Sequence, residues 1–118
     1  MTRQQELELL AEWLGIEGDY IEKASLQGIV VWSKLDDEFI ELHTWNPLTN
    51  DTDFLNMVAG RVDFTFGQYG VKAEVFPEGL YFKKAHSFID HNNDKLAAMK
   101  HAAYQVCLMA AGEGKKNV

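Results

Sequence analysis

The chain begins with apolar residues at helical spacing. Over residues 3–14, three leucines fall on one face, which is the pattern of an amphipathic helix that packs against a core. Thr2 and Gln5 have the spacing of a capping box, and Gly15 follows as a stop signal. We therefore expect a first helix over residues 3–14. The leucines of its apolar face are Leu7, Leu10 and Leu14.

Two more helices are predicted further along the chain. The second is short and begins after Thr49 or Asn50, either of which can cap it. The third is long, runs over residues 94–111 and is capped by Asn92 or Asn93. The apolar faces are expected to hold Phe54, Leu55, Met57 and Val58 in the second helix, and Leu96, Met99, Ala103, Val106 and Ala110 in the third.

The segments between the helices have the pattern of strands. Residues 28–33 and 39–45 are rich in β-branched and aromatic residues, and the short polar stretch between them predicts a hairpin. Three later segments are bounded by glycine-containing turns, which predicts an antiparallel meander. The polar residues 19–27 predict a loop or a short helical turn. The strands of the meander are expected over residues 62–66, 71–76 and 80–85.

This order of elements, α-β-β-α-β-β-β-α, predicts the α+β class. No predicted helix is apolar all round, so the helices are expected to pack on an antiparallel-rich sheet of about five strands. The strand over residues 28–32 is nearly all apolar, which favours cover on both faces of the sheet. We expect a single α+β domain over residues 1–111 and a flexible polar tail over residues 112–118.

Composition narrows the class of protein. Of 118 residues, 47% are hydrophobic and 25% are charged, values near the average of globular domains. No apolar run approaches the roughly 20 residues of a membrane helix. The first residues lack the pattern of a secretory signal, and Cys107 is the single cysteine, which fits a reducing compartment. These features predict a cytoplasmic protein without a membrane partner.

The chain is acidic, with a net charge of -7 from 11 basic and 18 acidic residues. A field of this sign repels phosphate backbones, so we expect no direct binding to nucleic acid. The acidic residues form three short groups, which we interpret as solvated faces and turns, with a docking surface for a basic partner as the alternative. The groups are Glu6, Glu8 and Glu12; Glu17, Asp19 and Glu22; and Asp36, Asp37, Glu38 and Glu41.

The residue types that carry catalysis or bind metals form no familiar constellation. His86, Asp90 and His91 are the nearest local cluster, but a spacing of five does not place two histidines on one helical face. Cys107 lies in an apolar stretch six positions from His101, so we expect a buried structural thiol. None of the common nucleotide-binding, metalloprotease or hydrolase motifs occurs. We therefore predict no catalytic residue, no metal site, no cofactor and no enzyme activity.

Residues 45–55, W-N-P-L-T-N-D-T-D-F-L, resemble the W-N-P-L-T-D-D-x-D-A-L segment of small phage and prophage proteins grouped as the phage ABA sandwich domain. The L-G-I-E-G of residues 14–18 is similar to their A-G-I-E-G, and residues 102–107 are similar to their closing helix, R-R-A-I-V-R-A-A. The resemblance implies a three-layer α-β-α sandwich and a phage or prophage gene, without an activity. This chain departs from the pattern at Asn50, where the group tends to have aspartate, and in its longer acidic hairpin at residues 36–41.

Trp45, Asn46 and Asp51 form the candidate binding surface within this stretch. An exposed tryptophan beside an amide is typical of an interaction hot spot. In the alternative structural role, Trp45 covers an edge of the core, Asn46 bonds the turn backbone and Pro47 sets the exit angle of the chain. Of the two, we favour the structural role.

The leading hypothesis for function is an accessory phage or prophage protein that binds an unidentified host or phage protein in the host cytoplasm. One alternative is an acidic inhibitor that occupies a basic nucleic-acid-binding groove of a host protein. Another is a small-molecule-binding domain with a pocket beside Trp45 or the loop at residues 86–90. Homo-oligomerisation is a third, because an uncovered strand edge or apolar sheet face favours self-association.

Overall fold

Two antiparallel sheets enclose the helices of the chain. The computed structural model describes residues 1–23, 26–35 and 38–116. Over these residues, sheet A has the strand order β1-β2-β3 and sheet B the order β4-β5-β6. The elements are, in order, α1 (Arg3–Leu14), β1 (Gly18–Lys23), β2 (Leu26–Leu35), β3 (Glu38–Trp45), α2 (Asp51–Val58), β4 (Val62–Phe66), β5 (Gly70–Val75), the 3₁₀ turn η1 (Pro77–Gly79), β6 (Phe82–Ser87), the 3₁₀ turn η2 (Ile89–His91) and α3 (Lys95–Lys116).

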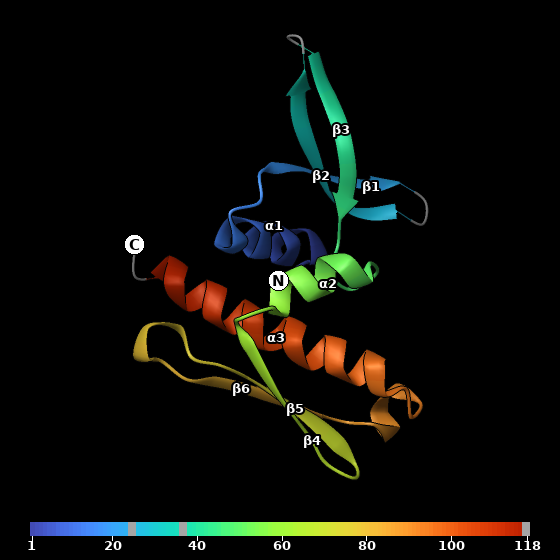
Figure 1. Ribbon diagram of the computed structural model, residues 1–118, viewed down its shortest axis with the longest axis vertical. Coiled ribbons are helices and arrows are strands. Elements are labelled where there is room, and N and C mark those ends of the chain that lie inside the picture. Colours follow the sequence, from blue (N-terminus) through green and yellow to red (C-terminus); the bar gives the residue numbers. More distant parts are fainter. Residues whose placement is uncertain (24–25, 36–37, 117–118) are drawn as a thin grey trace.

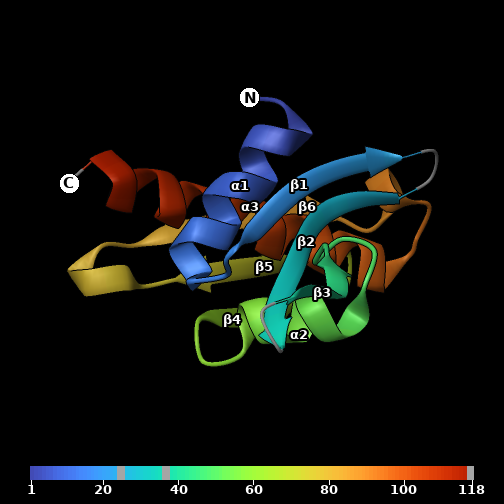
Figure 2. The same ribbon diagram turned by 90° about the horizontal axis from the view of Figure 1, so that it is seen from above.

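The helices form the inner layers of the molecule. α3 packs on β5 and β6, while α1 packs on α3 and also on β1 and β2. Figure 1 shows the resulting order of layers, which is sheet A, then α1 and α2, then α3, then sheet B. Seen from above in Figure 2, α1 lies beside β1, at the edge of sheet A. The sheets therefore lie outside and the helices inside.

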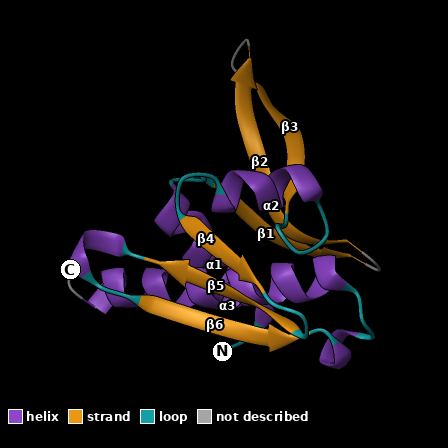
Figure 3. Ribbon diagram, turned by 60° about the horizontal axis from the view of Figure 1, so that its bottom comes forward, coloured by secondary structure: helices purple, strands orange, loops and turns teal. Residues whose placement is uncertain are grey.

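This arrangement corrects the prediction of one sheet of about five strands in a three-layer α-β-α sandwich. In sheet B, Phe64 lies opposite Ala73, which is fully buried, so both face α3. Asp63, Glu74 and Lys83 lie opposite one another on the other face, which is polar. Figure 3 shows sheet B from this outer side, with the helices behind it. A second layer of helices would find no apolar surface to cover there.

β1 is the strand missing from the predicted order. The prediction of a loop or helical turn over residues 19–27 is wrong, because β1 and the start of β2 occupy the described part of that segment. Tyr20 pairs with Ile29 of β2, and its hydroxyl accepts a hydrogen bond from Nε2 of Gln27 at 2.7 Å. Edge strands with one wet side tolerate polar residues, and this composition hides the strand pattern.

The caps of α1 and α2 agree with the sequence. The Thr2 hydroxyl accepts a hydrogen bond from the Gln5 N–H, and the Gln5 side chain accepts one from the Thr2 N–H. Gly15 ends α1 in the left-handed region at φ 74°. Asn50 caps α2 by accepting a hydrogen bond from the Asp53 N–H at 3.0 Å. The predictions of both caps, and of the range of α1, are confirmed.

α3 differs from its prediction at both ends. Its cap is Asp94, whose Oδ1 accepts a hydrogen bond from the Ala97 N–H at 3.0 Å. Asn92 and Asn93 instead adopt left-handed conformations, with φ of 55° and 61°. The helix continues to Lys116, into the segment expected as a tail, since a glycine within a helix costs only about 1 kcal/mol.

The core lies between the two sheets and includes the inner faces of α1, α2 and α3. Two residues predicted for it are exposed: Leu55 by 60% and Leu96 by 47%. In α2 the inward position is taken by Asp53, and Leu96 lies in the first turn of α3, ahead of its first buried residue, Ala98. The largest fully buried side chains are Leu7, Leu10, Ile29, Met57, Val30, Val106, Pro47 and Cys107.

The predicted hairpin and meander are confirmed. β2 pairs with β3, and β5 pairs with both β4 and β6, all antiparallel. The β2–β3 register shifts between Val31 and Trp32, where a bulge bends the hairpin. Beyond this bend the hairpin extends away from the other elements (Figure 1), and the molecule measures 52 × 35 × 25 Å.

Candidate functional site

The Trp45-Asn46-Pro47 motif joins sheet A to α2. Trp45 is 3% exposed and Asn46 is 4% exposed. The Asn46 amide Nδ2 donates to the Gln27 carbonyl at 2.7 Å, and its Oδ1 accepts a hydrogen bond from the Leu48 N–H at 2.9 Å. These are the contacts of the structural role, because Trp45 packs in the core and Asn46 bonds the turn backbone. Asn46 thereby ties the end of β3 to the start of β2.

Asp53 is the buried charge of this junction. Its Oδ2 accepts a hydrogen bond from the Asn46 N–H at 3.0 Å, and its Oδ1 lies 3.2 Å from Nε2 of the half-exposed His43. Sequence reasoning missed this pair because it assigned Asp53 to the first turn of α2 alone. Asp51, the third residue of the candidate binding surface, is exposed and pairs with Lys100 of α3.

A pocket of about 530 Å³ opens beside the Asp53–His43 pair. Arg61 lies at its rim, and Nη1 of this residue donates to the carbonyls of Asn56 and Met57 at the end of α2, at 3.1 and 3.4 Å. A pocket therefore exists beside Trp45, where the small-molecule alternative placed one. Its lining combines the apolar side chains of Leu14, Ile16, Val31, Trp45 and Met57 with the polar side chains of Glu17, His43, Asp53, Asn56 and Arg61.

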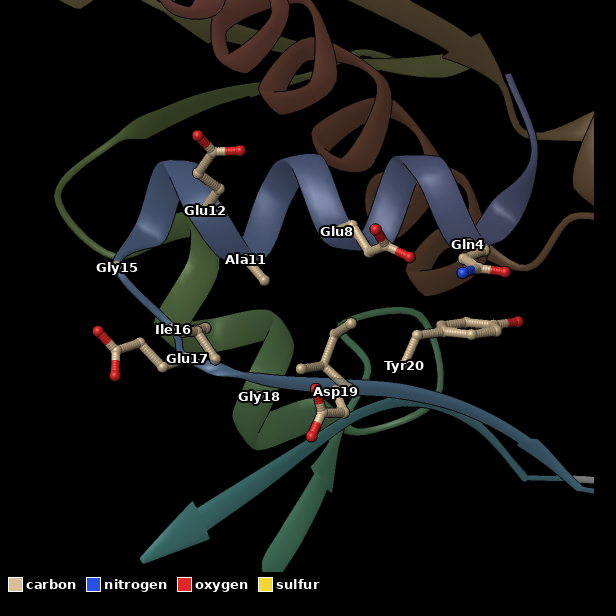
Figure 4. A pocket seen from close by; sticks show the side chains of 11 residues that line it. Gln4, Glu8, Ala11, Glu12, Gly15, Ile16, Glu17, Gly18, Asp19 and Tyr20 are labelled. Carbon is tan, nitrogen blue, oxygen red and sulfur yellow. The ribbon is translucent and has the colours of Figure 1, made fainter.

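A larger groove, of about 730 Å³, lies between α1 and β1 (Figure 4). Four acidic residues border the groove, Glu8 and Glu12 on α1 and Glu17 and Asp19 in the segment that enters β1. In Figure 4, Glu8 lies on the side of α1 toward β1, whereas Glu12 and Asp19 point away from the space between α1 and β1. Among the described residues that line this acidic groove there is no lysine, arginine or histidine. The floor is apolar, formed by Ala11, Ile16, Tyr20 and Ile29. Residues from two of the three acidic groups of the sequence thus border one groove, which their separation along the chain did not reveal.

β1 also exposes its backbone beside this groove. The strand pairs with β2 on one side and lies at the edge of sheet A, so within the described chain its other side has no partner strand. An open edge presents a row of N–H and C=O groups that can pair with an added strand. The acidic groove therefore offers carboxylates from α1 and backbone hydrogen-bonding groups from β1.

Three histidines meet at the corner between sheet B and α3. His86 lies in β6, His91 in η2, and His101 in α3, one turn before Gln105. His86 Nδ1 is 2.8 Å from His91 Nε2, and His86 Nε2 is 2.7 Å from the Gln105 Oε1. The His91 and His101 rings stack with their centroids 4.9 Å apart. The closeness of His86 and His91 along the chain indicated this pair, whereas His101 reaches them only through the packing of α3.

This histidine cluster is held together by its own hydrogen bonds. Among the described residues, no group of three histidine, cysteine, aspartate or glutamate side chains is arranged to hold a metal ion.

Cys107 is buried, as predicted, and burial raises the pKa of its thiol to about 12. Such a thiol carries almost no thiolate at neutral pH and is a poor nucleophile.

The helices of the described chain are too short or too polar to cross a bilayer. No family model, no curated protein and no solved structure matches the chain. The resemblance to the phage ABA sandwich domain therefore stays a prediction that rests on the three motif segments of the sequence.

Proposed function

We propose that this protein binds a basic segment of another protein in the acidic groove between α1 and β1. The observation that carries the proposal is the composition of the groove lining, which has four acidic residues and, among the described residues, no basic side chain. Because the whole chain carries a net charge of -7, its long-range field attracts a basic partner as well.

The shape of the groove favours an extended segment. Its volume of about 730 Å³ falls within the range of roughly 300–1,000 Å³ that ligand sites occupy, so it holds several side chains. The free edge of β1 can pair with the backbone of such a segment, while alternate lysine or arginine side chains point toward α1 and reach Glu8. The aliphatic parts of these basic side chains cover the apolar floor of the groove.

This proposal includes the inhibitor alternative, in which the basic segment belongs to the nucleic-acid-binding groove of a host protein. In that case, nucleic acid and this protein compete for the same partner residues, and adding DNA or RNA displaces it. Binding to a partner without affinity for nucleic acid supports the general accessory role instead.

A labelled peptide of alternating arginine and valine, compared with its glutamate–valine counterpart, tests the groove by fluorescence anisotropy. We expect the basic peptide alone to bind, and its affinity to fall as salt increases because exposed charge pairs are screened. The substitution Glu8→Gln should weaken binding up to about fivefold, since an exposed charge pair contributes up to about 1 kcal/mol.

The matched control is Glu113→Gln, which removes the same charge from α3, away from the groove. Equal weakening in both variants would reduce the effect to net charge and refute a site in the groove. Binding that does not change with salt would also contradict the proposal.

A second candidate function is the binding of a small molecule in the pocket beside Trp45. Apolar walls with a few converging polar groups are typical of ligand sites. Here the Asp53–His43 pair lines a pocket of about 530 Å³ together with apolar side chains. A fragment screen followed by thermal shift tests this function. Hits that are lost in His43→Ala support it, and a screen without hits contradicts it.

The origin and the cellular setting remain our proposals too. The motif segments at residues 45–55 and 14–18 support a phage or prophage gene and action on a host or phage protein in the host cytoplasm. Affinity capture from infected cells tests both points, because a partner with a basic extended segment is expected. Light scattering tests homo-oligomerisation, for which the open edge of β1 is the supporting feature.

A further inference from the structure

The hydrogen bonds of the histidine cluster restrict where its protons lie. Oε1 of Gln105 is an acceptor, so Nε2 of His86 carries the proton of their 2.7 Å contact. The 2.8 Å contact between His86 Nδ1 and His91 Nε2 then holds one proton between two nitrogens, one of which must offer its lone pair. An imidazolium ring has no lone pair. His86 and His91 therefore cannot both be charged while this bond exists.

His101 adds a second restriction through its ring. The ring stacks on His91 at a centroid distance of 4.9 Å and an angle of 23°. The pKa of His101 lies below its usual value of 6.5, first because the ring is partly buried and then because positive charge on His91, His86 and Arg3 opposes its own. Further protonation of the cluster therefore meets both a missing lone pair and repulsion between like charges.

The neighbouring elements supply little compensation for added positive charge. Gln105 of α3 is neutral. Arg3 of α1 adds positive charge near His101 and lowers its pKa further. Glu6, the acidic residue of α1 at this junction, is already paired with Arg3 at 3.4 Å. Asp90 of η2 is exposed to solvent. The cluster thus tolerates little protonation in its closed arrangement.

We infer that the histidine cluster is an acid-sensitive clasp, which releases η2 and the end of β6 from α3 when a second proton binds. The release is local, because Phe88 lies between the clasp residues, is 5% exposed, and donates its N–H to the Tyr69 carbonyl at 2.9 Å. Opening uncovers the surface of α3 around His101 and Gln105. This behaviour is independent of the acidic groove, which lies on the far side of α1.

Native-state hydrogen exchange of the full chain, corrected for intrinsic rates, tests the clasp between about pH 8 and about pH 5, where histidines change charge. We expect residues 89–93 to lose protection on acidification while Phe88, β2 and β3 keep theirs. For each proton taken up on opening, the opening constant should rise up to about tenfold per pH unit below about pH 6.5.

His91→Gln distinguishes opening caused by protonation of the cluster from a general loss of stability in acid. Glutamine can form a hydrogen bond with His86 but takes up no proton between about pH 8 and about pH 5. In this variant we expect residues 89–93 to remain protected at about pH 5. His43→Gln is the control, since it removes the histidine that lies outside the cluster, and the acid opening should persist.

An NMR titration of the wild-type histidine rings gives a second readout that needs no variant. Coupled titration, with His101 protonated last, supports the clasp. Three independent titrations at ordinary values overturn it, and so does acid opening in His91→Gln that equals the opening of the wild type.

Discussion

Asn46→Ala is the substitution whose cost follows most directly from the structure. The amide side chain is 4% exposed and makes two hydrogen bonds to backbone groups of different segments, the Gln27 carbonyl at 2.7 Å and the Leu48 N–H at 2.9 Å. Alanine removes both bonds and leaves both backbone groups without a partner. The bond from the Asn46 N–H to Asp53 is a backbone contact and survives the change.

The cost can be worked from these two contacts. Each hydrogen bond contributes about 0.5–1.5 kcal/mol, and a buried group that loses its partner costs about 1–3 kcal/mol. Gln27 and Leu48 are only partly buried, so water can satisfy part of the loss, and we expect about 2–3 kcal/mol in total. For a domain of this size, that loss lowers Tm by about 10 °C.

Urea unfolding followed by fluorescence measures the loss as a lower midpoint with an unchanged slope. Asn56→Ala is the matched control, because Asn56 is an exposed residue of α2 and should change the free energy of unfolding by less than about 0.5 kcal/mol. Asn46→Asp should cost at least as much as Asn46→Ala, since a carboxylate there lies beside buried Asp53. A loss below about 1 kcal/mol for Asn46→Ala would refute the role of this residue as a tie between β2 and β3.

Three further predictions concern the core, the glycines and metals. Burial raises the pKa of Tyr104 from 10.0 and that of Cys107 from 9.0, both to about 12. The stability that comes from these neutral groups should be complete below about pH 9 and fall as pH rises toward 12. Thermal unfolding scans should show a flatter decline for Cys107→Ala. Gly28→Ala should cost about 1–3 kcal/mol in urea unfolding, because its Cβ would lie 2.5 Å from the Trp45 carbonyl oxygen. Gly112→Ala should stabilise the chain by about 0.5–1 kcal/mol, because Gly112 lies within α3 and an added Cβ would meet no atom there. Zinc titration by calorimetry should show no binding, because His86 and His91 bond each other; micromolar binding would contradict this account.

Local signals in the sequence predicted most element boundaries. Thr2, Gln5 and Gly15 mark α1 because the groups that satisfy a helix end are close in sequence. β1 escaped prediction because an edge strand needs few apolar residues, and Asp19 and Glu22 mask its pattern. Periodicity also does not tell whether a hairpin and a meander share one sheet. That depends on which faces the helices cover, and the polar outer face of sheet B was the available signal.

The candidate sites depend on contacts between distant segments. Asp53 has the sequence context of a capping residue, yet its carboxylate faces inward because the Asn46 N–H and His43 lie there. His101 joins His86 only when α3 packs on sheet B, and no local spacing encodes that approach. Once a register is known, however, alternation along β6 places His86 on the side of α3, since it lies opposite the buried Val71.

The packing of α1 on α3 has a consequence for the synthesis of the chain. The Tyr104 hydroxyl of α3 donates to Glu6 of α1 across a separation of 98 residues. α3 is the main helical neighbour of α1 among the described elements. While a ribosome is still adding the last helix, α1 has already emerged, and the part of its surface that packs on α3 has no cover. The nascent chain therefore completes its core late, and a chaperone that shields α1 during translation would be expected to protect it from aggregation.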